Sequence, residues 1–400
     1  MAGDEIRLNE MRIMFAVHTY YPARNGVQMV TQYMAEGLAL RHDVLVITEL
    51  KEGNGTEKRA EFAGVRIERI RVRRKGYRFI GDRDVLLRRI IDWSPDILIS
   101  VCTQSWPFDW LWGELEKLPC HKVLYTHGYS GLMEKWPLWE DLTHMRLHAF
   151  LYHAYWKWYY DRAYRYIAQY DLVTYLSEDD AACVYGRAHG LTNGSVLCNA
   201  VEDMFFEAAE LKDRTAERGQ EYGDGLVRFI CVSNYDENKN QEMILDSFQK
   251  ARLKQAKLTF IGSSENEYYR KLVAIAQQMP EGSVTFLTGI DRTEIPLHLA
   301  RADVYICGSR KETYGMALCE AAAVGLPVIS TPVGIAPQME GCLIVHSVNE
   351  MSEAIRLLSI SSQERMIRGR KLRSYAQAHY RVQDKIEWME ERLMQLAASK

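Results

Sequence analysis

The stretch VYICGSRKETYGMALCEAAAVGLPVIS, residues 304–330, predicts a strand, a loop, a helix and a second strand in that order. Its first three and last three letters are mostly β-branched or apolar, as in strands that are buried on both faces. Gly315 marks the start of the helix, and Gly325-Leu326-Pro327 separates that helix from the second strand. A βαβ unit of this kind indicates parallel α/β construction.

The same alternation of short apolar runs with helical patterns continues on both sides of this stretch. In the first half of the chain, strands are expected at residues 12–17, 44–48, 65–70, 97–101, 122–126, 172–176 and 195–197. In the second half they are expected at residues 227–232, 258–261, 284–287, 304–306, 328–330 and 343–345. We therefore expect two successive sets of parallel βαβ units.

A polar, charge-rich segment, Glu207–Gly225, separates the two halves and lacks apolar periodicity, which indicates an interdomain connector. The chain then divides into an N-terminal domain of residues 1–206, the connector of residues 207–225 and a C-terminal domain of residues 226–380. The helix of residues 381–400 is a candidate for packing back on the N-terminal domain. Two or three domains are the expectation for a chain of 400 residues.

The segment Trp136–Tyr170 breaks the alternation, because it is rich in Trp and Tyr and long enough for two helices. One interpretation is a helical pair whose aromatic rings pack on the sheet and on each other. The other is that part of this surface lines a cleft for an acceptor, since aromatic rings stack on sugars and apolar chains. The sequence leaves both interpretations open.

Composition and charge exclude several classes of protein. Apolar residues make up 47% of the chain and charged residues 26%, which is typical of a packed globular protein. The formal net charge of −3 provides no overall positive field, so we expect no nucleic-acid partner. The apolar runs are far shorter than the roughly 20 residues of a membrane-spanning helix. The first residues do not read as a secretory signal, which favours a cytoplasmic protein.

Nothing in the sequence predicts a metal site. The eight cysteines include no CxxC pair and lie mostly in apolar segments, which favours reduced, buried thiols. A zinc site assembled from distant cysteines is the alternative, without ligand spacing to support it. Asp82-Arg83-Asp84 matches the letters of a DxD metal motif, but it precedes a helical pattern and is interpreted as a helix N-cap. We expect no metal and no cofactor.

Two carboxylates are the strongest candidates for a binding site, because ligands of parallel α/β sheets bind at the carboxyl ends of the strands. Glu312 lies in the loop after the strand of residues 304–306, and Glu320 follows eight residues later in the helix. Gly315 lies at the start of that helix, where unpaired backbone amides could receive a diphosphate. The arrangement offers one carboxylate to a hexose and the other to a ribose, with phosphates between them.

Three more residues stand in loops that follow strands. Lys239 is placed to hold a diphosphate as a point charge, or is simply solvated. Gly26 either lets the backbone approach a ligand closely or is a turn glycine, and the absence of a GxGxxG pattern argues against a nicotinamide cofactor. His127 either holds a phosphate or a sugar hydroxyl or is a hydrogen-bonded structural histidine.

These residues resemble those of the GT-B glycosyltransferases, in particular the large retaining family 4. SRKETYGMALCEAAAVGLPVISTPVG, residues 309–334, is similar to the E-x7-E block of that family. Further similar stretches are NKNQEMILDSF (residues 238–248), LCNAVEDMFF (residues 197–206) and NGVQMVTQYMAEGLALRHDVLVIT (residues 25–48). The resemblance covers nearly the whole chain and is weakest at residues 50–95 and 130–170.

The resemblance implies an α/β protein of two Rossmann-like domains facing a cleft. The nucleotide-sugar donor is then expected in the C-terminal domain and the acceptor largely in the N-terminal one. Carried over by position, Glu312 contacts the donor hexose and Glu320 binds the ribose. Backbone amides near the helix start meet the diphosphate or the hexose, and these belong to Tyr314, Gly315, Met316 and Ala317.

The resemblance assigns roles to three further residues and exposes one departure from the family pattern. Lys239 is expected to hold the diphosphate, Gly26 to let the first loop reach it, and His127 to approach the transferred sugar. The family commonly pairs this lysine with an arginine, at the position that Asn234 occupies here. Asparagine carries no positive charge, so less charge faces the leaving group, and Arg310 and Arg24 are the candidates for compensating the loss.

The resemblance implies a metal-independent, retaining glycosyltransferase. It would move a hexose-type sugar from a UDP- or GDP-sugar to a glycan, a lipid-linked saccharide or a small hydroxylated acceptor. The sequence shows no clear nucleophile opposite the donor, which favours front-face transfer with the leaving phosphate oxygen deprotonating the acceptor. Two alternatives remain open, a GT-B nucleotide-sugar epimerase and a nucleotide-sugar-binding protein without catalysis.

One basic segment points to a possible further partner. Residues Arg66–Arg89 contain ten basic and three acidic side chains. This segment is a candidate for peripheral contact with the anionic inner face of a membrane. The alternative is an ordinary solvated surface, since runs of charge are usually just exposed.

Overall fold

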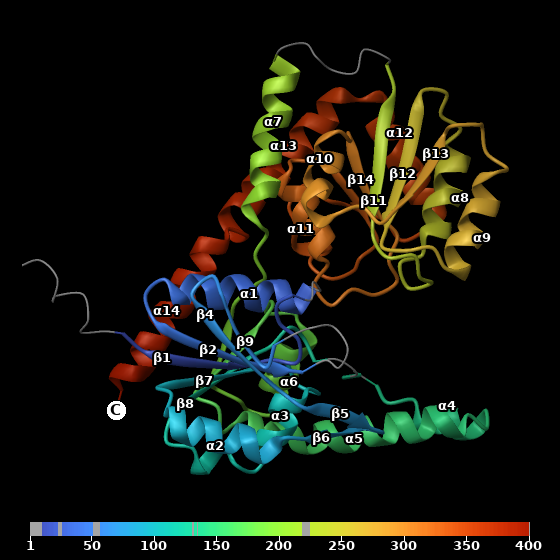
Figure 1. Cartoon of the computed structure of the whole chain (residues 1–400). Coiled ribbons are helices and arrows are strands. Elements are labelled where there is room, and N and C mark those ends of the chain that lie inside the picture. The colour runs from blue at the N-terminus through green and yellow to red at the C-terminus, as the bar shows by residue number, and fades with distance from the viewer. Residues whose placement is uncertain are drawn as a thin grey trace, which may run out of the picture. The chain divides into compact units, whose positions relative to one another are not determined.

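The computed structural model of the protein describes residues 10–22, 26–50, 57–129, 132–133, 135–217 and 225–399, without the side chains of residues 212–217. The chain forms two compact units. The N-terminal unit contains Met1–Asn199 and Gln383–Lys400, and the C-terminal unit contains Ala200–Val382. Each is built on a mainly parallel sheet with helices around it (Figure 1), which confirms the predicted α/β class with two Rossmann-like domains.

The N-terminal unit is built on an eight-stranded sheet with the order β10-β9-β8-β7-β1-β2-β4-β3, in which only β3 runs antiparallel to its neighbour. The strands of this sheet are β1 (Arg12–Ala16), β2 (Asp43–Glu49), β3 (Arg59–Phe62), β4 (Val65–Ile70), β7 (Ile97–Val101), β8 (His121–Tyr125), β9 (Leu172–Tyr175) and β10 (Gly194–Val196). A separate two-stranded antiparallel ribbon is formed by β5 (Val72–Lys75) and β6 (Arg78–Gly81). Every residue of β7 is buried, as expected for a strand covered on both faces.

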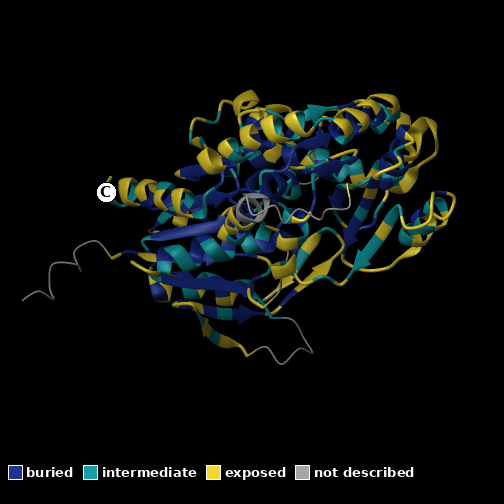
Figure 2. Ribbon diagram, turned by 90° about the horizontal axis from the view of Figure 1, so that it is seen from above, coloured by how far each residue is buried: buried dark blue, intermediate teal, exposed yellow. Residues whose placement is uncertain are grey.

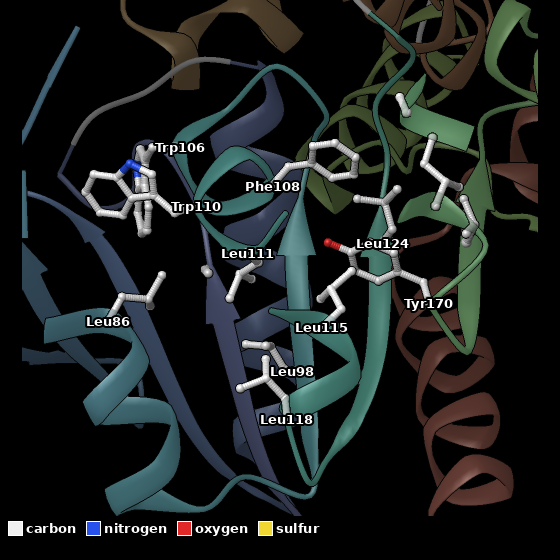
Figure 3. Close-up of a cluster of buried hydrophobic side chains, with 14 of the residues drawn as sticks. Leu86, Leu98, Trp106, Phe108, Trp110, Leu111, Leu115, Leu118, Leu124 and Tyr170 are labelled. Atoms are coloured by element: carbon white, nitrogen blue, oxygen red, sulfur yellow. The ribbon is translucent and has the colours of Figure 1, made fainter. Parts of the chain in front are cut away.

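The helices of this unit are α1 (Gly26–Ala39), α2 (Arg83–Trp93), α3 (Trp106–Leu111), α4 (Leu138–Thr143), α5 (Leu147–Ile167), α6 (Ala181–Ala188) and α14 (Val382–Ala398), with a 3₁₀ turn at Leu115–Lys117. Helices α2, α3, α5 and α6 contribute to one large apolar core with the sheet. Figure 3 shows part of this core, where Phe108 of α3 lies near Leu124 of the sheet. Trp106 and Trp110 of α3 and Leu98 of the sheet belong to the same cluster.

The C-terminal unit has a six-stranded, fully parallel sheet with the order β13-β12-β11-β14-β15-β16. Its strands are β11 (Val227–Val232), β12 (Ala256–Gly262), β13 (Val284–Thr288), β14 (Val304–Cys307), β15 (Val328–Ser330) and β16 (Leu343–Ile344). Its helices are α7 (Asp203–Glu217), α8 (Gln241–Ala251), α9 (Glu267–Ala276), α10 (Ile295–Ala300), α11 (Met316–Ala323), α12 (Val348–Ile360) and α13 (Ser362–His379), with 3₁₀ turns at Arg292–Glu294 and Ala336–Gln338. Figure 2 shows buried residues along the strands and exposed ones on the outer faces of the helices.

The strands predicted from apolar runs are present within a few residues of their expected bounds, but three short strands were missed. Strand β3 and the ribbon β5–β6 carry several charged residues and present little buried apolar surface. Arg73, Arg74 and Lys75 fill most of β5, so the sequence read as a charged surface segment. Pairing across a tight turn, not an apolar face, defines this ribbon.

The described part of the predicted connector Glu207–Gly225 is helical, because helix α7 continues through Glu217. The division of the chain also differs from the expected one, since residues from Ala200 onward already belong to the C-terminal unit. Phe205 and Ala209 of α7 are fully buried, so the helix has an apolar side. Because the segment is rich in charged residues, its sequence shows no clear apolar periodicity.

The aromatic segment Trp136–Tyr170 forms the two expected helices, α4 and α5. The interpretation as packed aromatics is confirmed for one side of α5, where Trp156, Tyr159 and Tyr160 lie in the apolar core. Other rings of the same segment, including Trp139 and Trp158, are exposed. No described contact tests the interpretation as an acceptor cleft.

Helix α14 belongs to the N-terminal unit, although it lies at the end of the chain. Glu390 of α14 pairs with Arg41 at 2.5 Å and with the buried His42 ring at 3.1 Å. A Cβ atom added at Gly37 of α1 would lie 2.2 Å from Cδ1 of Ile386. Glycine at position 37 therefore provides the space in which α14 packs against α1.

Gly37→Ala tests this packing. Alanine normally stabilises a helix by about 1 kcal/mol relative to glycine, but here the overpacking is expected to destabilise the N-terminal unit by about 1 to 3 kcal/mol. In the background of Ile386→Ala the same substitution should become stabilising, because the obstructing side chain is gone. Urea unfolding of the four proteins measures this change of sign, and a stabilising Gly37→Ala in the wild-type background would contradict the packing.

Candidate active site

The candidate site of the C-terminal unit lies where strands β11 and β14 end. These strands are neighbours in the parallel sheet, with Phe229 opposite Val304 and Ile230 opposite Tyr305. Their carboxyl ends therefore meet at the same edge of the sheet, which is where parallel α/β folds bind ligands. The loop of residues 233–240 follows β11, and the loop of residues 308–315 follows β14.

Hydrogen bonds hold these two loops together. The backbone N–H of Arg310 donates to the carbonyl oxygen of Asn238 at 2.7 Å. The side-chain amide of Asn238 donates in turn to the carbonyl oxygen of Lys311 at 2.8 Å. The loops therefore form one layer, and side chains from both reach the same place.

Lys239 and Glu312 meet at this layer. The Lys239 ammonium Nζ lies 2.7 Å from Oε1 of Glu312, and the hydroxyl of Ser309 donates to the same oxygen at 2.7 Å. Both side chains are mostly but not fully buried. Two of the predicted site residues are thus brought together, and Ser309 is a third member that the sequence did not single out.

The backbone before α8 directs Lys239 toward this place. Asn240 adopts the left-handed conformation with φ of 51°, which asparagine tolerates better than most residues. The N–H of Lys239 is held by Asp236, whose carboxylate accepts it at 3.0 Å. The buried amide of Gln241 donates to Ser233 Oγ and to the carbonyl oxygen of Asn234, each at 2.9 Å.

The start of α11 presents backbone amides at the same sheet edge. Gly315 has φ of 92°, a conformation that suits glycine, and helix α11 begins at the next residue. The first N–H groups of a helix have no partner within the helix, and here they belong to Met316 and Ala317. The carbonyl oxygen of Tyr314 accepts from the N–H of Ile335 at 2.9 Å, which ties this turn to the loop after β15.

Glu320 lies deeper than the sequence suggested and has a charged partner. Its side chain is 5% exposed, and Oε1 accepts from the guanidinium of Arg292 at 2.7 Å. The same Arg292 nitrogen donates to Glu202 Oε2 at 2.6 Å. Burial raises the pKa of the Glu320 carboxyl, and the guanidinium of Arg292 opposes that shift. Arg292 thus lies between two carboxylates, one from α11 and one just before α7.

Sequence reasoning missed both Arg292 and Glu202. Arg292 follows β13 by four residues, so the rule that ligand residues follow strands would have marked its loop. Glu202 lies within the family-like stretch LCNAVEDMFF, but nothing in that stretch marks it as the partner of an arginine ninety residues away. Only the packing of α7 on this unit brings it there.

Two predicted residues lie at the surface of the same loops. Asn234 is exposed, and its backbone oxygen is held by Gln241. The side chain of Arg310 is also exposed, while its backbone joins the loop layer. Neither side chain belongs to the cluster of Lys239, Glu312 and Ser309.

The two candidates of the N-terminal unit have different surroundings. His127 follows β8, and its Nδ1 lies 3.2 Å from Oδ1 of Asn199. Burial lowers the pKa of His127 to about 4, so the ring is neutral at pH 7. With Nδ1 donating to Asn199, Nε2 is an acceptor, and it has no partner among the described residues. Gly26 is the exposed first residue of α1, and the residues just before it lie outside the described part.

The described residues contain no group of three or more His, Cys, Asp or Glu side chains that could hold a metal ion. Asp82 occupies the N-cap position of α2, but its side chain makes no cap bond there. Its carboxylate instead accepts from the backbone N–H of Arg71 at 3.1 Å, which corrects the expected capping bond. All eight cysteines are free thiols, five of them buried.

Two protein-family models match the chain, one to each unit. Residues 24–191 match the model described as Glycosyltransferase Family 4, and residues 227–360 match Glycosyl transferases group 1. The chain belongs to these glycosyltransferases. The Lys239, Glu312 and Glu320 side chains all lie within the group 1 match.

Known relatives and a solved structure agree with this assignment. The chain is 28% identical over 176 residues to N-acetyl-alpha-D-glucosaminyl L-malate synthase of Bacillus anthracis, covering 43% of this chain and 44% of the relative. It is 28% identical over 139 residues to alpha-monoglucosyldiacylglycerol synthase of Streptococcus pneumoniae, covering 34% and 32%. The chain thus spans less than half the length of these two relatives. Sucrose-phosphate synthase of Thermosynechococcus elongatus shares the GT-B fold, with a TM-score of 0.71, 16% identity and coverage of 98% of this chain and 100% of that one.

Arg292→Leu tests the charged pair at Glu320. The substitution leaves the Glu320 carboxylate buried without its partner, so the free energy of unfolding is expected to fall by about 3 to 5 kcal/mol. Adding Glu320→Gln should recover part of this loss, because the buried charge is then removed. Arg301→Leu is the matched control at an exposed arginine and should change the free energy by no more than about 0.5 kcal/mol.

The loss caused by Arg292→Leu should also depend on pH. A carboxyl whose pKa is raised by folding destabilises the folded state increasingly as pH rises above its unfolded pKa. Urea titrations of variant and wild type should therefore show a smaller difference at about pH 5 than at about pH 8. A difference that does not change with pH would mean that Arg292 acts through packing alone.

Proposed function

We propose that this protein is a retaining, metal-independent glycosyltransferase. It moves a hexose-type sugar from a UDP- or GDP-sugar to a glycan, a lipid-linked saccharide or a small hydroxylated acceptor. The observation that carries the proposal is the cluster of Lys239, Glu312 and Ser309 beside the amides of α11, at the carboxyl edge of a parallel sheet. Membership in the family supports the reaction class.

The geometry of the cluster suits an activated sugar. Both described partners of Glu312 bond to Oε1, which leaves Oε2 to accept from a hexose hydroxyl. The Lys239 ammonium has three hydrogens and uses one on Glu312, so two remain for the diphosphate. The amides of Met316 and Ala317 add the positive end of the helix dipole. Arg310, exposed two residues before Glu312 in the same loop, is the candidate for added charge.

Glu320 suits a ribose in the same way. Arg292 occupies Oε1 and holds the carboxylate in one orientation, and Oε2 is left for the ribose hydroxyls. A carboxylate that accepts two neighbouring hydroxyls selects a ribose without contacting the base. This is why the site by itself does not distinguish UDP- from GDP-sugars.

The chemistry proposed is a front-face displacement. The bond from the sugar C1 to the phosphate oxygen breaks, and a bond from C1 to the acceptor oxygen forms on the same face. The acceptor proton passes to the departing phosphate oxygen, and the nucleoside diphosphate leaves with it. Lys239 and the α11 amides stabilise the negative charge that develops on that phosphate, and no protein nucleophile takes part.

Two residues of the N-terminal unit complete the proposal. His127 is neutral and presents Nε2 as an acceptor, which suits a hydroxyl of the transferred sugar and not a phosphate oxygen. Gly26 is exposed and an added Cβ atom would meet nothing within 4 Å, so the chain there is open to a ligand. In this proposal His127 approaches the transferred sugar, and Gly26 lets the first loop reach the diphosphate.

Asn234 supports a second candidate function, a nucleotide-sugar-binding protein without catalysis. The family arginine is absent, and the exposed Arg310 side chain makes no ion pair among the described residues. A panel of UDP- and GDP-sugars separates the two candidates, since a binding protein shows affinity but neither transfer nor donor hydrolysis. A nucleotide-sugar epimerase would instead release an epimerised sugar without an acceptor.

The relatives guide the choice of acceptors to test. The Streptococcus pneumoniae relative is named for a glucosyldiacylglycerol and the Bacillus anthracis relative for malate. Lipid and small hydroxylated acceptors are therefore the first to try. A lipid-linked acceptor would place the enzyme at the inner face of a membrane as a peripheral protein.

Glu312→Gln tests the cluster. The substitution keeps the shape but removes the carboxylate charge, and turnover is expected to fall by about 100-fold or more. The fold should survive, because glutamine can still accept from Lys239 and Ser309. Glu237→Gln, in the exposed part of the loop before Lys239, is the control and should keep wild-type turnover. Near-normal transfer by Glu312→Gln would contradict the role given to Glu312.

Chelation tests the proposed independence from metal ions. Transfer should continue at the same rate after dialysis against EDTA, since Lys239 and backbone amides supply the positive charge that a metal otherwise supplies. The measurement is the initial rate with and without chelator at equal ionic strength. A loss of activity that manganese restores would overturn this part of the proposal.

A further inference from the structure

The exposed apolar side chains of the described residues are not spread evenly. Seven of the 21 large ones fall between Trp139 and Trp158, on helices α4 and α5 and in the turn between them. We call them the α4–α5 apolar face, which consists of Trp139, Leu142, Met145, Leu147, Leu151, Tyr152 and Trp158. Trp139 is 78% exposed and Met145 is 91% exposed. Clusters of this kind on a soluble unit mark interaction surfaces.

Helix α5 carries large apolar side chains on two opposite sides, one of them buried and the other exposed. Leu147, Leu151 and Trp158 follow one another at spacings of four and seven residues, so they share one side of the helix. The opposite side holds Trp156 and Tyr160, which pack into the core. The exposed apolar side chains therefore do not contribute to the core of the unit.

Buried charge fixes α4 against α5. The Asp141 carboxylate is buried, and its Oδ2 lies 2.6 Å from Nδ1 of His153 on α5. Its Oδ1 lies 3.1 Å from the guanidinium of Arg146. These contacts hold the two helices in one arrangement, which extends beyond the sheet of the N-terminal unit (Figure 1).

A basic ribbon lies directly beside the apolar face. The ring of Tyr77, in the turn between β5 and β6, stacks on Tyr155 of α5 with centroids 4.4 Å apart, and it also contacts Tyr152. Figure 1 shows β5 and β6 running alongside α5. The basic side chains that flank Tyr77 are Arg74, Lys75 and Arg78, and all three are exposed.

The structure separates these basic residues from the rest of the segment Arg66–Arg89. Outside the ribbon tip, five arginines bond to groups of the N-terminal unit: Arg66 to Asp43, Arg69 to backbone oxygens, Arg71 to Asp82, Arg83 to Glu114 and Arg89 to Glu68. Among the described residues, Arg74, Lys75 and Arg78 form no ion pair with a carboxylate. The positive charge available to a partner therefore lies at the tip, next to the apolar face.

We propose that the α4–α5 apolar face and the β5–β6 tip together form a docking surface for a membrane that contains anionic phospholipids. Trp, Tyr, Leu and Met side chains enter the boundary between headgroups and acyl chains, while Arg74, Lys75 and Arg78 meet the phosphates. The proposed contact is interfacial, as expected for a surface that combines apolar and basic side chains. No helix within the described residues is long and apolar enough to cross a bilayer. A second copy of the chain would bring a second positive tip to the same surface, which charge complementarity disfavours.

This inference deepens the proposed function, because it names the surface that would bring the enzyme to a lipid-linked acceptor. The link to a lipid-linked acceptor rests on the proposed function, whereas the binding of the surface to a membrane does not. Membrane binding needs neither donor nor acceptor, so it is measured separately from transfer. A wild-type protein that binds nucleotide but does not bind vesicles would count against the surface alone. Vesicle binding without any response to nucleotide sugars counts against the proposed function alone.

The test is flotation of the full-length protein with vesicles of phosphatidylcholine containing about 30 mol% phosphatidylglycerol, compared with pure phosphatidylcholine. The wild-type protein should bind the anionic vesicles, and this binding should weaken as the salt concentration is raised from about 50 to 500 mM. Reversing the three tip charges, Arg74→Glu, Lys75→Glu and Arg78→Glu, should weaken binding by about 100-fold. Replacing Trp139, Leu147 and Leu151 with serine should weaken it by at least about 10-fold.

Matched controls change the same residue types elsewhere. Leu40→Ser with Ile360→Ser removes comparably exposed apolar side chains, and Lys254→Glu with Lys257→Glu reverses exposed charges. Both controls should bind vesicles like the wild type, and all variants should keep the wild-type thermal unfolding temperature. Absence of wild-type binding, or equal losses in variants and controls, would overturn the proposal. Sedimentation that shows self-association abolished by the serine variant would assign the surface to a second copy, and would also overturn it.

Discussion

The adjacency of β11 and β14 in a parallel sheet is the constraint on which the candidate site depends. Because these two strands are neighbours, the loops at their carboxyl ends must share one edge, and an ammonium from one loop can meet a carboxylate from the other. Neither loop could form this contact alone, since Lys239 and Glu312 lie 73 residues apart in the chain. One backbone bond and one side-chain bond between Asn238 and the loop after β14 keep the two charges in register.

Charge that is taken out of water needs a partner, and this requirement organises the rest of the site. Glu320 is almost fully buried and is held by Arg292, which also bonds to Glu202 just before α7. A carboxylate held on one oxygen keeps a fixed orientation and still offers the other oxygen to a ligand. Helix α7 thereby contributes to the site without lining it, which gives a physical role to a segment whose letters resemble a linker.

The N-terminal unit has more apolar side chains than its core buries. Its core takes the aromatic side chains of α3 and of one side of α5, which together cover the sheet. Helix α4 and the other side of α5 keep apolar side chains at the surface. They lie next to the tip of the β5–β6 ribbon, where Arg74, Lys75 and Arg78 form no ion pair with a carboxylate of the described residues. The core of the unit does not require this second apolar side, so a partner outside the chain is its simplest explanation.

The sequence by itself determined the parallel α/β class, most of the strands and the carboxylate pair Glu312 and Glu320, because apolar runs and residues after strands are local signals. It did not determine the β5–β6 ribbon or the helical nature of α7, since strand pairing and a single apolar helix side are hidden by charged letters. Only the tertiary structure decided that Ser309 joins Glu312, that Arg292 and Glu202 hold Glu320, and that five arginines of the basic segment are already paired. Those contacts join residues that are distant along the chain or buried by packing, and neither distance in space nor burial is written in the order of the residues.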